Sequence, residues 1–293
     1  MATEPVAGQR LAVSAALRSA AERLAAAGIQ SPRVDAELLL AHLLGVPRSR
    51  LILLPELTPE QAGHFAELVG RRATGVPVQH LTGRAPYRHL DLAVGPGVFI
   101  PRPETELMLD LAAAALASAE LVVDLCSGSG AIALAVAQEY PQAAVHAVER
   151  EPAALEWLRR NAIERAAAGD RPISVLSADI ADPALLAELS GRVDVVLSNP
   201  PYVPAAVRAE LAPEIGHDPE QAVFAGPDGL RLMPSVLRAA ARLLQPGGLL
   251  LVEHDASHGQ ALPDLLGTAG DWRAVTDLAD LAGRPRFARA VRA

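Results

Sequence analysis

The sequence contains no lysine, a single cysteine and few aromatic residues. Its 26 cationic side chains are all arginine, 34 residues are acidic, and the formal net charge is -8 at pH 7. The single cysteine, Cys126, excludes an internal disulfide bond and any metal site built from several cysteines, and we expect no bound metal. Proteins that grip duplex nucleic acid usually carry a basic patch, because neutralising phosphates supplies much of the affinity. The acidic balance therefore disfavours a nucleic-acid partner.

Long hydrophobic runs are also missing. No apolar stretch approaches the ~18 residues needed to span a bilayer. The start, MATEPVAGQR, lacks a basic segment followed by an apolar one. The chain is 51% hydrophobic and 20% charged, which is typical of a globular protein, and its 293 residues suffice for one large and one small domain. We therefore expect a cytoplasmic protein without membrane association.

The first part of the sequence contains the capping and stop signals of short helices. Ser31 and Pro32 form a cap and first-turn pair before an apolar series. Thr58 and Gln61 form a capping-box pattern. These signals predict a helical domain over residues 1–76, which needs tight bundling or a partner surface to be stable.

The pattern changes at residues 77–100, where Gly and Pro interrupt short runs with a period of two, so we expect a hairpin in a domain linker. From 101 to 293, short apolar runs alternate with stretches long enough for crossover helices. The runs are LVVDLC, AVHAVE, ISVLSADI, VDVVLSNP and LLLVEH. Buried parallel strands read as continuous apolar runs, so we expect an α/β domain with a doubly wound sheet covered by helices on both faces.

A glycine-rich turn follows the first of these strands. It reads Cys126-Ser127-Gly128-Ser129-Gly130 and leads into a helical segment. Glycines let the backbone approach a ligand closely, and ligands of such sheets bind beyond the carboxyl ends of the strands. Glu149 ends the second strand 19 residues after Gly130, near the ~20 expected for an acid that accepts hydrogen bonds from ribose hydroxyls. The turn therefore predicts a nucleotide-type cofactor.

The turn alone does not choose that cofactor. Gly128, Gly130 and Ala133 also fit the fingerprint for nicotinamide or flavin nucleotides. Asp124 favours S-adenosylmethionine, because its carboxylate can pair with the cationic amino-acid part of that molecule and would repel a pyrophosphate. Asp179 ends the third strand, and two interpretations stay open: an acceptor for an adenine amino group, or a cap for a following helix.

The motif Asn199-Pro200-Pro201-Tyr202 directly follows the fourth strand. Two consecutive prolines remove two backbone donors and hold the chain extended, which leaves carbonyls free to accept hydrogen bonds. The Asn199 side chain adds an acceptor, and Tyr202 offers a flat surface for a planar group. Two acceptors in one pocket suit an amino group with two hydrogens, whereas the alternative is a rigid Asn-Pro loop. Its place beside a nucleotide turn favours the functional interpretation.

This combination resembles the methyltransferases that act on a nitrogen attached to a planar carbon, in adenine, guanine or glutamine. Other segments resemble one group of them, the peptide-chain release factor glutamine methyltransferases (PrmC/HemK family). These segments are QHLTG (79–83), FIPRPETE (99–106), FAGPDGL (224–230), Glu253-His254 with Gln260, and DLAGRPRF (280–287). The resemblance covers nearly the whole chain. His80 and Glu149 depart from it, standing where tyrosine and aspartate are common, but each keeps a polar or acidic group.

The resemblance implies a Rossmann-like class I methyltransferase domain with a seven-stranded mixed sheet, preceded by a small helical domain that helps to engage the substrate. It implies S-adenosyl-L-methionine as cofactor and S-adenosyl-L-homocysteine as product. The implied substrate and partner is a class-one peptide-chain release factor, methylated on the glutamine of its Gly-Gly-Gln motif, and we expect the enzyme to be a monomer.

Three sets of site residues follow from the motifs and the resemblance together. The expected catalytic residues are Asn199, Pro200 and Tyr202. The expected cofactor-binding residues are Phe99, Arg102, Asp124, Cys126, Ser127, Gly128, Gly130, Ile132, Glu149, Arg150, Asp179, Ile180 and Asn199. The expected substrate-binding residues are Pro103, Glu104, Asn199, Pro200, Pro201 and Tyr202.

Three other functions compete with this one. A nucleic-acid amino-methyltransferase would use the same pocket, but the net charge and the whole-chain resemblance disfavour it. The intact glycine turn and Asn-Pro-Pro-Tyr loop disfavour a non-catalytic binding module. An NAD-dependent oxidoreductase lacks an evident proton donor for hydride chemistry and leaves residues 199–202 unexplained.

Overall fold

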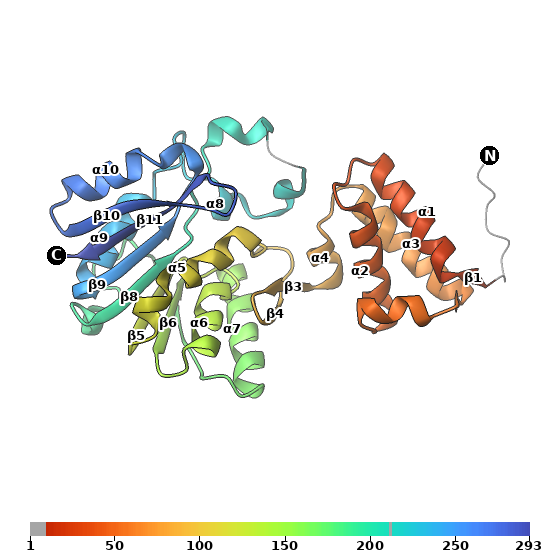
Figure 1. Ribbon diagram of the computed structural model, residues 1–293, viewed down its shortest axis with the longest axis horizontal. Coiled ribbons are helices and arrows are strands. Elements are labelled where there is room, and N and C mark those ends of the chain that lie inside the picture. Colours follow the sequence, from red (N-terminus) through yellow and green to blue (C-terminus); the bar gives the residue numbers. More distant parts are fainter. Residues whose placement is uncertain (1–9, 211–212) are drawn as a thin grey trace. The chain divides into compact units, whose positions relative to one another are not determined.

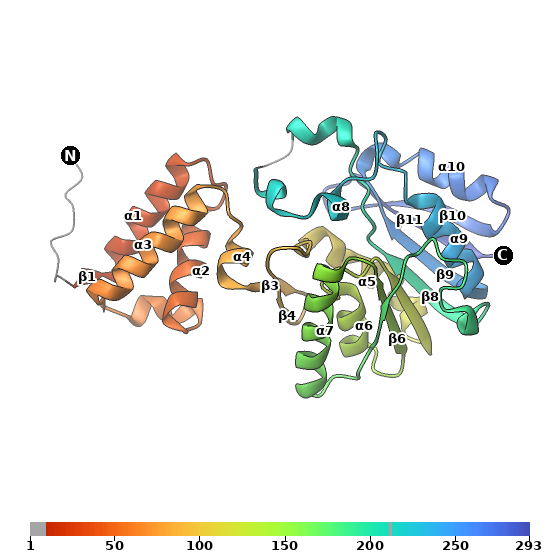
Figure 2. The ribbon, with the colours of Figure 1, turned by 180° about the vertical axis from the view of Figure 1, so that it is seen from behind.

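The computed structural model describes residues 10–210 and 213–293, which form two compact units (Figures 1 and 2). The helical unit contains the described residues up to Arg84 together with the segment that ends at His217. The sheet unit contains residues 85–210 and 218–293. The chain first passes from the helical unit to the sheet unit after Arg84, inside the stretch 77–100, and the segment that ends at His217 returns to the helical unit. Residues 1–9, on which the expectation about a leader segment rests, lie outside the described part.

The helical unit is a small bundle with its own apolar core. Its elements are β1 (Leu11–Ala12), α1 (Val13–Ala26), α2 (Pro32–Leu44), η1 (Arg48–Leu53), β2 (Glu56–Leu57), α3 (Pro59–Ala73) and α4 (Val78–Thr82), with η1 a 3-10 helix. Leu24, Leu39 and Phe65 are among the side chains buried between the helices. Tight bundling therefore supplies the stability that short helices lack by themselves.

The caps of two helices show how local sequence sets their starts. Thr58 Oγ1 accepts a hydrogen bond from the Gln61 amide at 3.2 Å, and Gln61 Oε1 accepts one from the Thr58 amide at 2.9 Å, so the predicted capping box is confirmed. Ser31 does precede α2, with Pro32 in its first turn, but its side chain makes no cap hydrogen bond. The start of α2 therefore depends on Pro32, whose fixed φ suits a first helical turn.

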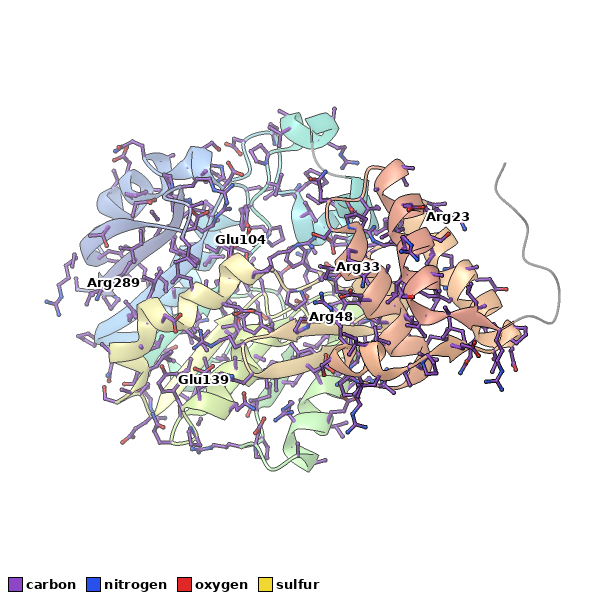
Figure 3. The ribbon with its side chains drawn as sticks, turned by 45° about the vertical axis from the view of Figure 1, so that its right-hand side comes forward. Arg23, Arg33, Arg48, Glu104, Glu139 and Arg289 are labelled. Atoms are coloured by element: carbon purple, nitrogen blue, oxygen red, sulfur yellow. The ribbon has the colours of Figure 1, made fainter. Side chains whose placement is uncertain are left out.

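A buried arginine joins three segments of the helical unit. Arg72 Nε lies 2.7 Å from Asp35 Oδ2, and Arg72 Nη2 lies 2.9 Å from Glu214 Oε1 in the 3-10 helix η5 (Pro213–His217). This contact holds a segment that is distant in sequence against α2 and α3. A second cluster on the same unit joins Arg33 and Arg48, both labelled in Figure 3, to the carboxylate of Glu37.

The sheet unit contains a seven-stranded mixed sheet with the order β10-β11-β9-β8-β5-β6-β7. Its strands are β5 (Leu121–Leu125), β6 (Ala144–Glu149), β7 (Ser174–Ser177), β8 (Val193–Ser198), β9 (Leu244–Glu253), β10 (Trp272–Ala279) and β11 (Pro285–Arg292). Strands β5 to β9 pair in parallel, and β11 runs antiparallel to both β9 and β10. The predicted class I fold is confirmed. Before the sheet, β3 (Arg84–Tyr87) and β4 (Leu90–Ala93) form a two-stranded sheet.

Helices cover both faces of the large sheet (Figures 1 and 2). One core joins the sheet to α5 (Leu107–Leu116), α6 (Ala131–Glu139) and α7 (Pro152–Ala167), and the other joins it to α9 (Met233–Leu243) and α10 (Ala261–Thr268). Val122 belongs to the first core and Val123 to the second, because successive strand side chains point to opposite faces. The remaining short elements are η2 (Pro103–Glu106), η3 (Ala187–Leu189), η4 (Ala205–Glu210), α8 (Glu220–Val223) and η6 (Ala256–His258).

The strand order reverses at the centre of the sheet. From β5 the chain first builds outward through β6 and β7, and it then returns to add β8 on the other side of β5. Loops that leave neighbouring strands in opposite directions open a crevice, and ligands of open α/β sheets bind there, beyond the carboxyl ends of the strands. The topology therefore places the site where the glycine turn and the Asn-Pro-Pro-Tyr loop begin.

Candidate active site

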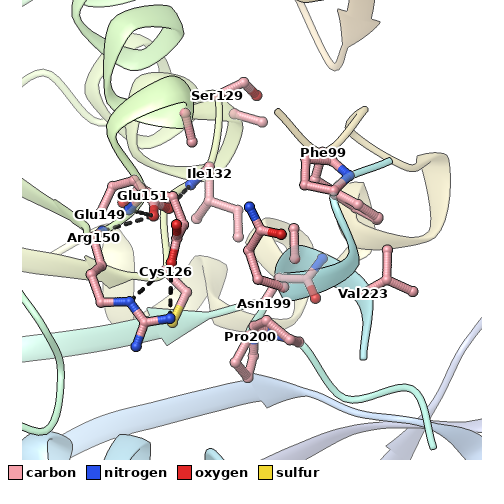
Figure 4. Close-up of a pocket in the computed structure, with 18 of the residues that line it drawn as sticks. Phe99, Cys126, Ser129, Ile132, Glu149, Arg150, Glu151, Asn199, Pro200 and Val223 are labelled. Atoms are coloured by element: carbon pink, nitrogen blue, oxygen red, sulfur yellow. Dashed lines mark hydrogen bonds and ion pairs between the residues drawn. The ribbon is translucent and has the colours of Figure 1, made fainter. Parts of the chain in front are cut away.

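A pocket of the sheet unit lies at the carboxyl ends of β5, β6 and β8 (Figure 4). It holds about 1180 Å³ of empty space, counting the solvent at its mouth.

Most of the predicted site residues meet in this pocket. Its lining includes Phe99, Arg102, Cys126, Ser127, Gly128, Ile132, Glu149, Arg150, Asp179, Ile180, Asn199, Pro200, Pro201 and Tyr202. Asp124 and Gly130 lie behind that lining. Pro103 and Glu104 do not line it either, because their side chains are exposed on η2, which instead turns Thr105 inward.

The turn after β5 has a backbone that few residues accept. Cys126, Gly128 and Gly130 all have positive φ, of 63°, 55° and 87°. A Cβ on Gly130 would come within 2.5 Å of Leu158 Cδ1, so only glycine fits there. Burial raises the pKa of the Cys126 thiol, which keeps it protonated and unreactive. The cysteine therefore fills space in the turn.

Glu149 holds this turn in place. Its Oε2 accepts a hydrogen bond from the Gly128 amide at 2.8 Å, and its Oε1 accepts hydrogen bonds from the Arg150 and Glu151 amides, both at 2.7 Å. A carboxylate has about four acceptor positions, so roughly one stays open for a ligand hydroxyl. The side chain predicted to bind ribose thus also fixes the backbone that surrounds the ligand.

Asp124 is a buried carboxylate with one oxygen unpaired. Its Oδ2 accepts a hydrogen bond from the Ala133 amide at 3.2 Å, whereas Oδ1 has no partner among the described residues. Burial raises the pKa of Asp124 from 3.8 to about 7, while hydrogen bonds with Ser127 and Ala133 oppose the rise. A cation placed near Oδ1 would stabilise the charged form, so the site fits the amino group of a cofactor.

Asp179 lies at the rim of the pocket beside Arg150. Its Oδ2 lies 3.1 Å from Arg150 Nη1, and its Oδ1 accepts a hydrogen bond from the Ala181 amide at 2.8 Å. The hydrogen bond from Ala181, followed by that from Arg150, lowers the pKa of Asp179. The residues after Asp179 form turns up to the short η3, so no α-helix begins where a cap was considered. Its role toward adenine stays a prediction.

The Asn-Pro-Pro-Tyr loop forms the other wall, and Figure 4 shows Asn199 and Pro200 in the same cavity as Glu149. Asn199 Nδ2 donates a hydrogen bond to Thr105 Oγ1 at 3.1 Å, which leaves its carbonyl oxygen for a ligand. The Tyr202 hydroxyl donates a hydrogen bond to Glu253 Oε1 at 2.7 Å. Each of the two side chains is thus held by a hydrogen bond to a buried residue.

The backbone of the loop is fixed as well. The Val203 amide donates to the Val223 carbonyl at 3.0 Å, and the Ala225 amide donates to the Val203 carbonyl at 3.1 Å. A Cβ on Gly229 would come within 2.2 Å of the Tyr202 carbonyl oxygen, and Gly229 has φ 77°. Glycine is therefore required where the two segments touch.

A third group of residues bounds the pocket near Phe99. The guanidinium of Arg102 lies 5.0 Å from the centre of the Phe99 ring and is paired with Asp218. Asp218 is buried, and its Oδ1 also accepts a hydrogen bond from the Ile100 amide at 3.1 Å. Sequence reasoning found Phe99 and Arg102 but missed Asp218, because the pairing spans more than a hundred residues.

Two more polar residues were missed, Thr105 and Glu253. Each stands inside a segment that carries the family resemblance, but nothing in the sequence assigned it a partner. Thr105 is 3% exposed and Glu253 is 1% exposed. Buried polar groups are nearly always paired, so a polar residue in a segment destined for the core is the signal that could have identified them.

The chain is similar to known proteins in sequence and in fold. The chain matches the family models described as the PrmC N-terminal domain, over residues 15–83, and the methyltransferase small domain, over residues 102–217. A solved methyltransferase from Pyrococcus furiosus is 19% identical with a TM-score of 0.51, covering 70% of this chain and 89% of that one. At this identity the likeness shows the fold, which is that of a class I methyltransferase.

Curated relatives identify the family within the methyltransferases. The release factor glutamine methyltransferase of Mycolicibacterium smegmatis is 50% identical over 94% of this chain and 96% of its own length. That of Streptomyces coelicolor is 46% identical over 95% of this chain and 98% of its own length. The chain therefore belongs to the release factor glutamine methyltransferase family, and the predicted family is confirmed.

Within residues 10–210 and 213–293, no helix is both long and apolar enough to cross a membrane. The same residues contain no group of three or more His, Cys, Asp or Glu side chains arranged to hold a metal ion.

The geometry of Glu149 leads to a prediction about cofactor binding. Glu149→Gln should weaken binding of S-adenosylhomocysteine by about 1.5 to 3 kcal/mol, the scale of a hydrogen bond to a charged group, because the amide has one acceptor oxygen where three backbone donors converge. Titration calorimetry measures this. Glu156→Gln, the same change at an exposed position of α7, should bind normally. Equal affinities for both variants would leave Glu149 without a part in ligand binding.

Proposed function

We propose that this protein transfers a methyl group from S-adenosyl-L-methionine to the side-chain amide nitrogen of the glutamine in the Gly-Gly-Gln motif of class-one peptide-chain release factors. The observation that carries the proposal is the position of Asn199 and Pro200 in the pocket that also contains the glycine turn. The names of the curated relatives support a release factor over a nucleic acid as substrate.

Several groups of the pocket fit the proposed cofactor. Asp124 lies behind the lining, so its charge would favour the ammonium group from there, and the remaining acceptor position of Glu149 suits a ribose hydroxyl. Asp179 and Ile180 lie where the adenine would be held, and Phe99 with Arg102 would close over the ligand. When bound, the cofactor supplies an electrophilic methyl group on a sulfonium.

The Asn-Pro-Pro-Tyr loop can activate a weak nucleophile. An amide nitrogen is a poor nucleophile, because resonance delocalises its lone pair into the carbonyl. Asn199 Oδ1 and the Pro200 carbonyl can each accept one N–H of the substrate amide, which aims the nitrogen at the methyl group. The same acceptors stabilise positive charge as it grows on the nitrogen, so they bind the transition state more strongly than the ground state. The methylated amide then loses one of its N–H protons to water.

The proposal extends to the partner and the setting. The release factor would be engaged with help from the helical domain, residues 1–76, since part of that domain matches the PrmC N-terminal model. We further propose that the enzyme acts as a monomer in the cytoplasm, where its substrate works in translation.

The proposal predicts where a radioactive methyl group will be found. Offered with labelled cofactor, a purified class-one release factor should take up label, because its glutamine amide presents the two hydrogens that Asn199 and Pro200 accept. The same factor with its Gly-Gly-Gln glutamine changed to alanine is the matched control and should stay unlabelled. Comparable labelling of that control, or of DNA or RNA, would contradict the proposal.

The role of the loop predicts the behaviour of Asn199→Ala. Removing one preorganised electrostatic partner commonly slows turnover by roughly 100- to 1,000-fold, and we expect a loss of that order in single-turnover methyl transfer. Cofactor affinity, measured by calorimetry, should change far less because Glu149 and the glycine turn are untouched. Near-normal transfer by this variant would mean that the motif only shapes the loop.

A further inference from the structure

Helix α7 packs against two backbone segments that lead to the pocket. A Cβ on Gly130, in the turn after β5, would come within 2.5 Å of Leu158 Cδ1. A Cβ on Gly95, in the segment that follows β4, would come within 2.5 Å of Trp157 Cζ2. Because glycine carries no side chain, both segments approach the helix closely. Two parts of the chain that are distant in sequence therefore meet on α7.

Asn161 is a residue of α7 that bonds to both segments. Its side-chain NH2 donates to the Ser129 carbonyl at 2.9 Å and to the Ala93 carbonyl at 3.0 Å, and its oxygen accepts a hydrogen bond from the Ala93 amide at 2.8 Å. Asn161 is 1% exposed. A backbone N–H only donates and a backbone carbonyl only accepts, so these partners determine which end of the side-chain amide is which.

Both segments continue into the lining of the pocket. Ser129 belongs to the lining itself, and the chain that leaves Ala93 reaches the lining at Gly97 and Phe99; Ser129 and Phe99 are labelled in Figure 4. Asn161 is not among the described residues that line the pocket. It can therefore act on a ligand only through the backbone that it holds.

We propose that Asn161 is a positioning residue for the cofactor, which holds the glycine turn and the Phe99 segment in place before a ligand binds. The inference rests on the proposed function, since the proposed cofactor is the ligand that would contact both segments. A binding site that is fixed in advance avoids the cost of ordering its parts when the ligand arrives. Without the side chain of Asn161, the ligand itself has to order the two segments, and its affinity falls.

Two variants of Asn161 test the effect on cofactor binding. Asn161→Leu branches at the same atom as asparagine but forms no hydrogen bond. Its Kd for S-adenosylhomocysteine, measured by titration calorimetry, should rise roughly 10-fold, the scale of one neutral hydrogen bond. Asn161→Asp keeps an acceptor for the Ala93 amide but turns an oxygen toward the Ser129 carbonyl, so it should weaken binding as well. An unchanged Kd in Asn161→Leu overturns the proposal.

A matched control separates positioning from a general loss of stability. Leu116 is buried at the end of α5, in the core that α5 shares with α7. Its carbonyl accepts a hydrogen bond from Gln142, which precedes β6, so it lies at the end of the strands opposite the pocket. Leu116→Ala opens a cavity and destabilises the fold. The folded Leu116→Ala protein should bind S-adenosylhomocysteine normally, and an equal loss of affinity in this control overturns the proposal.

Hydrogen exchange gives a second readout that needs neither ligand nor activity. In Asn161→Leu the Ala93 amide loses its acceptor, so peptides that contain Ala93 or Gly130 should exchange faster than in the unmodified protein. Leu116→Ala should leave the exchange of these peptides unchanged. Equal exchange of both peptides in Asn161→Leu and the unmodified protein overturns the proposal. Asn161→Asp, which keeps the bond to the Ala93 amide, replaces Asn161→Leu in calorimetry if the leucine variant fails to fold.

Kinetics connect the role of Asn161 to the reaction. In Asn161→Leu the KM for S-adenosylmethionine should rise roughly 10-fold, while turnover at saturating cofactor should stay near that of the unmodified protein, because the Asn-Pro-Pro-Tyr loop is unchanged. A structural defect would instead lower turnover at an unchanged KM, and that result overturns the proposal.

Failure of this inference differs from failure of the proposed function. If the unmodified protein methylates a release factor but Asn161→Leu binds S-adenosylhomocysteine equally well, the positioning role is wrong and the proposed function stands. If the unmodified protein methylates no release factor, the proposed function is wrong, and calorimetry with hydrogen exchange still decides whether Asn161 holds the two segments.

Discussion

The wall of the pocket that contains the glycine turn depends on Glu149, whose carboxylate accepts hydrogen bonds from three backbone amides in two turns. One carboxylate ties the turn after β5, through Gly128, to the turn after β6, through Arg150 and Glu151. Neither turn belongs to a helix or strand, so neither has a ladder of hydrogen bonds to hold it. A buried charge is stable only when it is paired or hydrogen-bonded, and here the same bonds shape the pocket.

The wall of the pocket formed by the Asn-Pro-Pro-Tyr loop is held in place differently. Two prolines and contacts with residues 223–229 make its loop rigid. Hydrogen bonds to Thr105 and Glu253 hold the side chains of Asn199 and Tyr202. The two walls meet because β5 and β8 are neighbours in the sheet although they are distant in sequence. Glu149 and Asn199 therefore lie on different walls of the pocket, which is why variants of the two are expected to differ in what they impair.

The sequence was informative where the physical signal is local. Continuous apolar runs identified the strands from β5 to β9, and the glycine turn and the Asn-Pro-Pro-Tyr motif both lead to one pocket. The sequence did not identify residues whose role depends on a hydrogen-bond partner far away in the chain. Buried hydrogen bonds connect three residues to the site, and the sequence shows none of these bonds. The residues are Asp218, Thr105 and Glu253. Pro103 and Glu104 are exposed on a 3-10 turn next to Thr105, and their contact with the substrate stays a prediction.

The central claim is that two acceptors, Asn199 Oδ1 and the Pro200 carbonyl, each take one hydrogen of the substrate amide. A glutamine that already carries a methyl group has a single N–H left, so it cannot satisfy both acceptors and aim its nitrogen at a second methyl group. Exhaustive treatment of a release factor, followed by tandem mass spectrometry of the Gly-Gly-Gln peptide, tests this directly. The glutamine should stop at one methyl group on its amide nitrogen. Accumulation of dimethylated glutamine would contradict the claim.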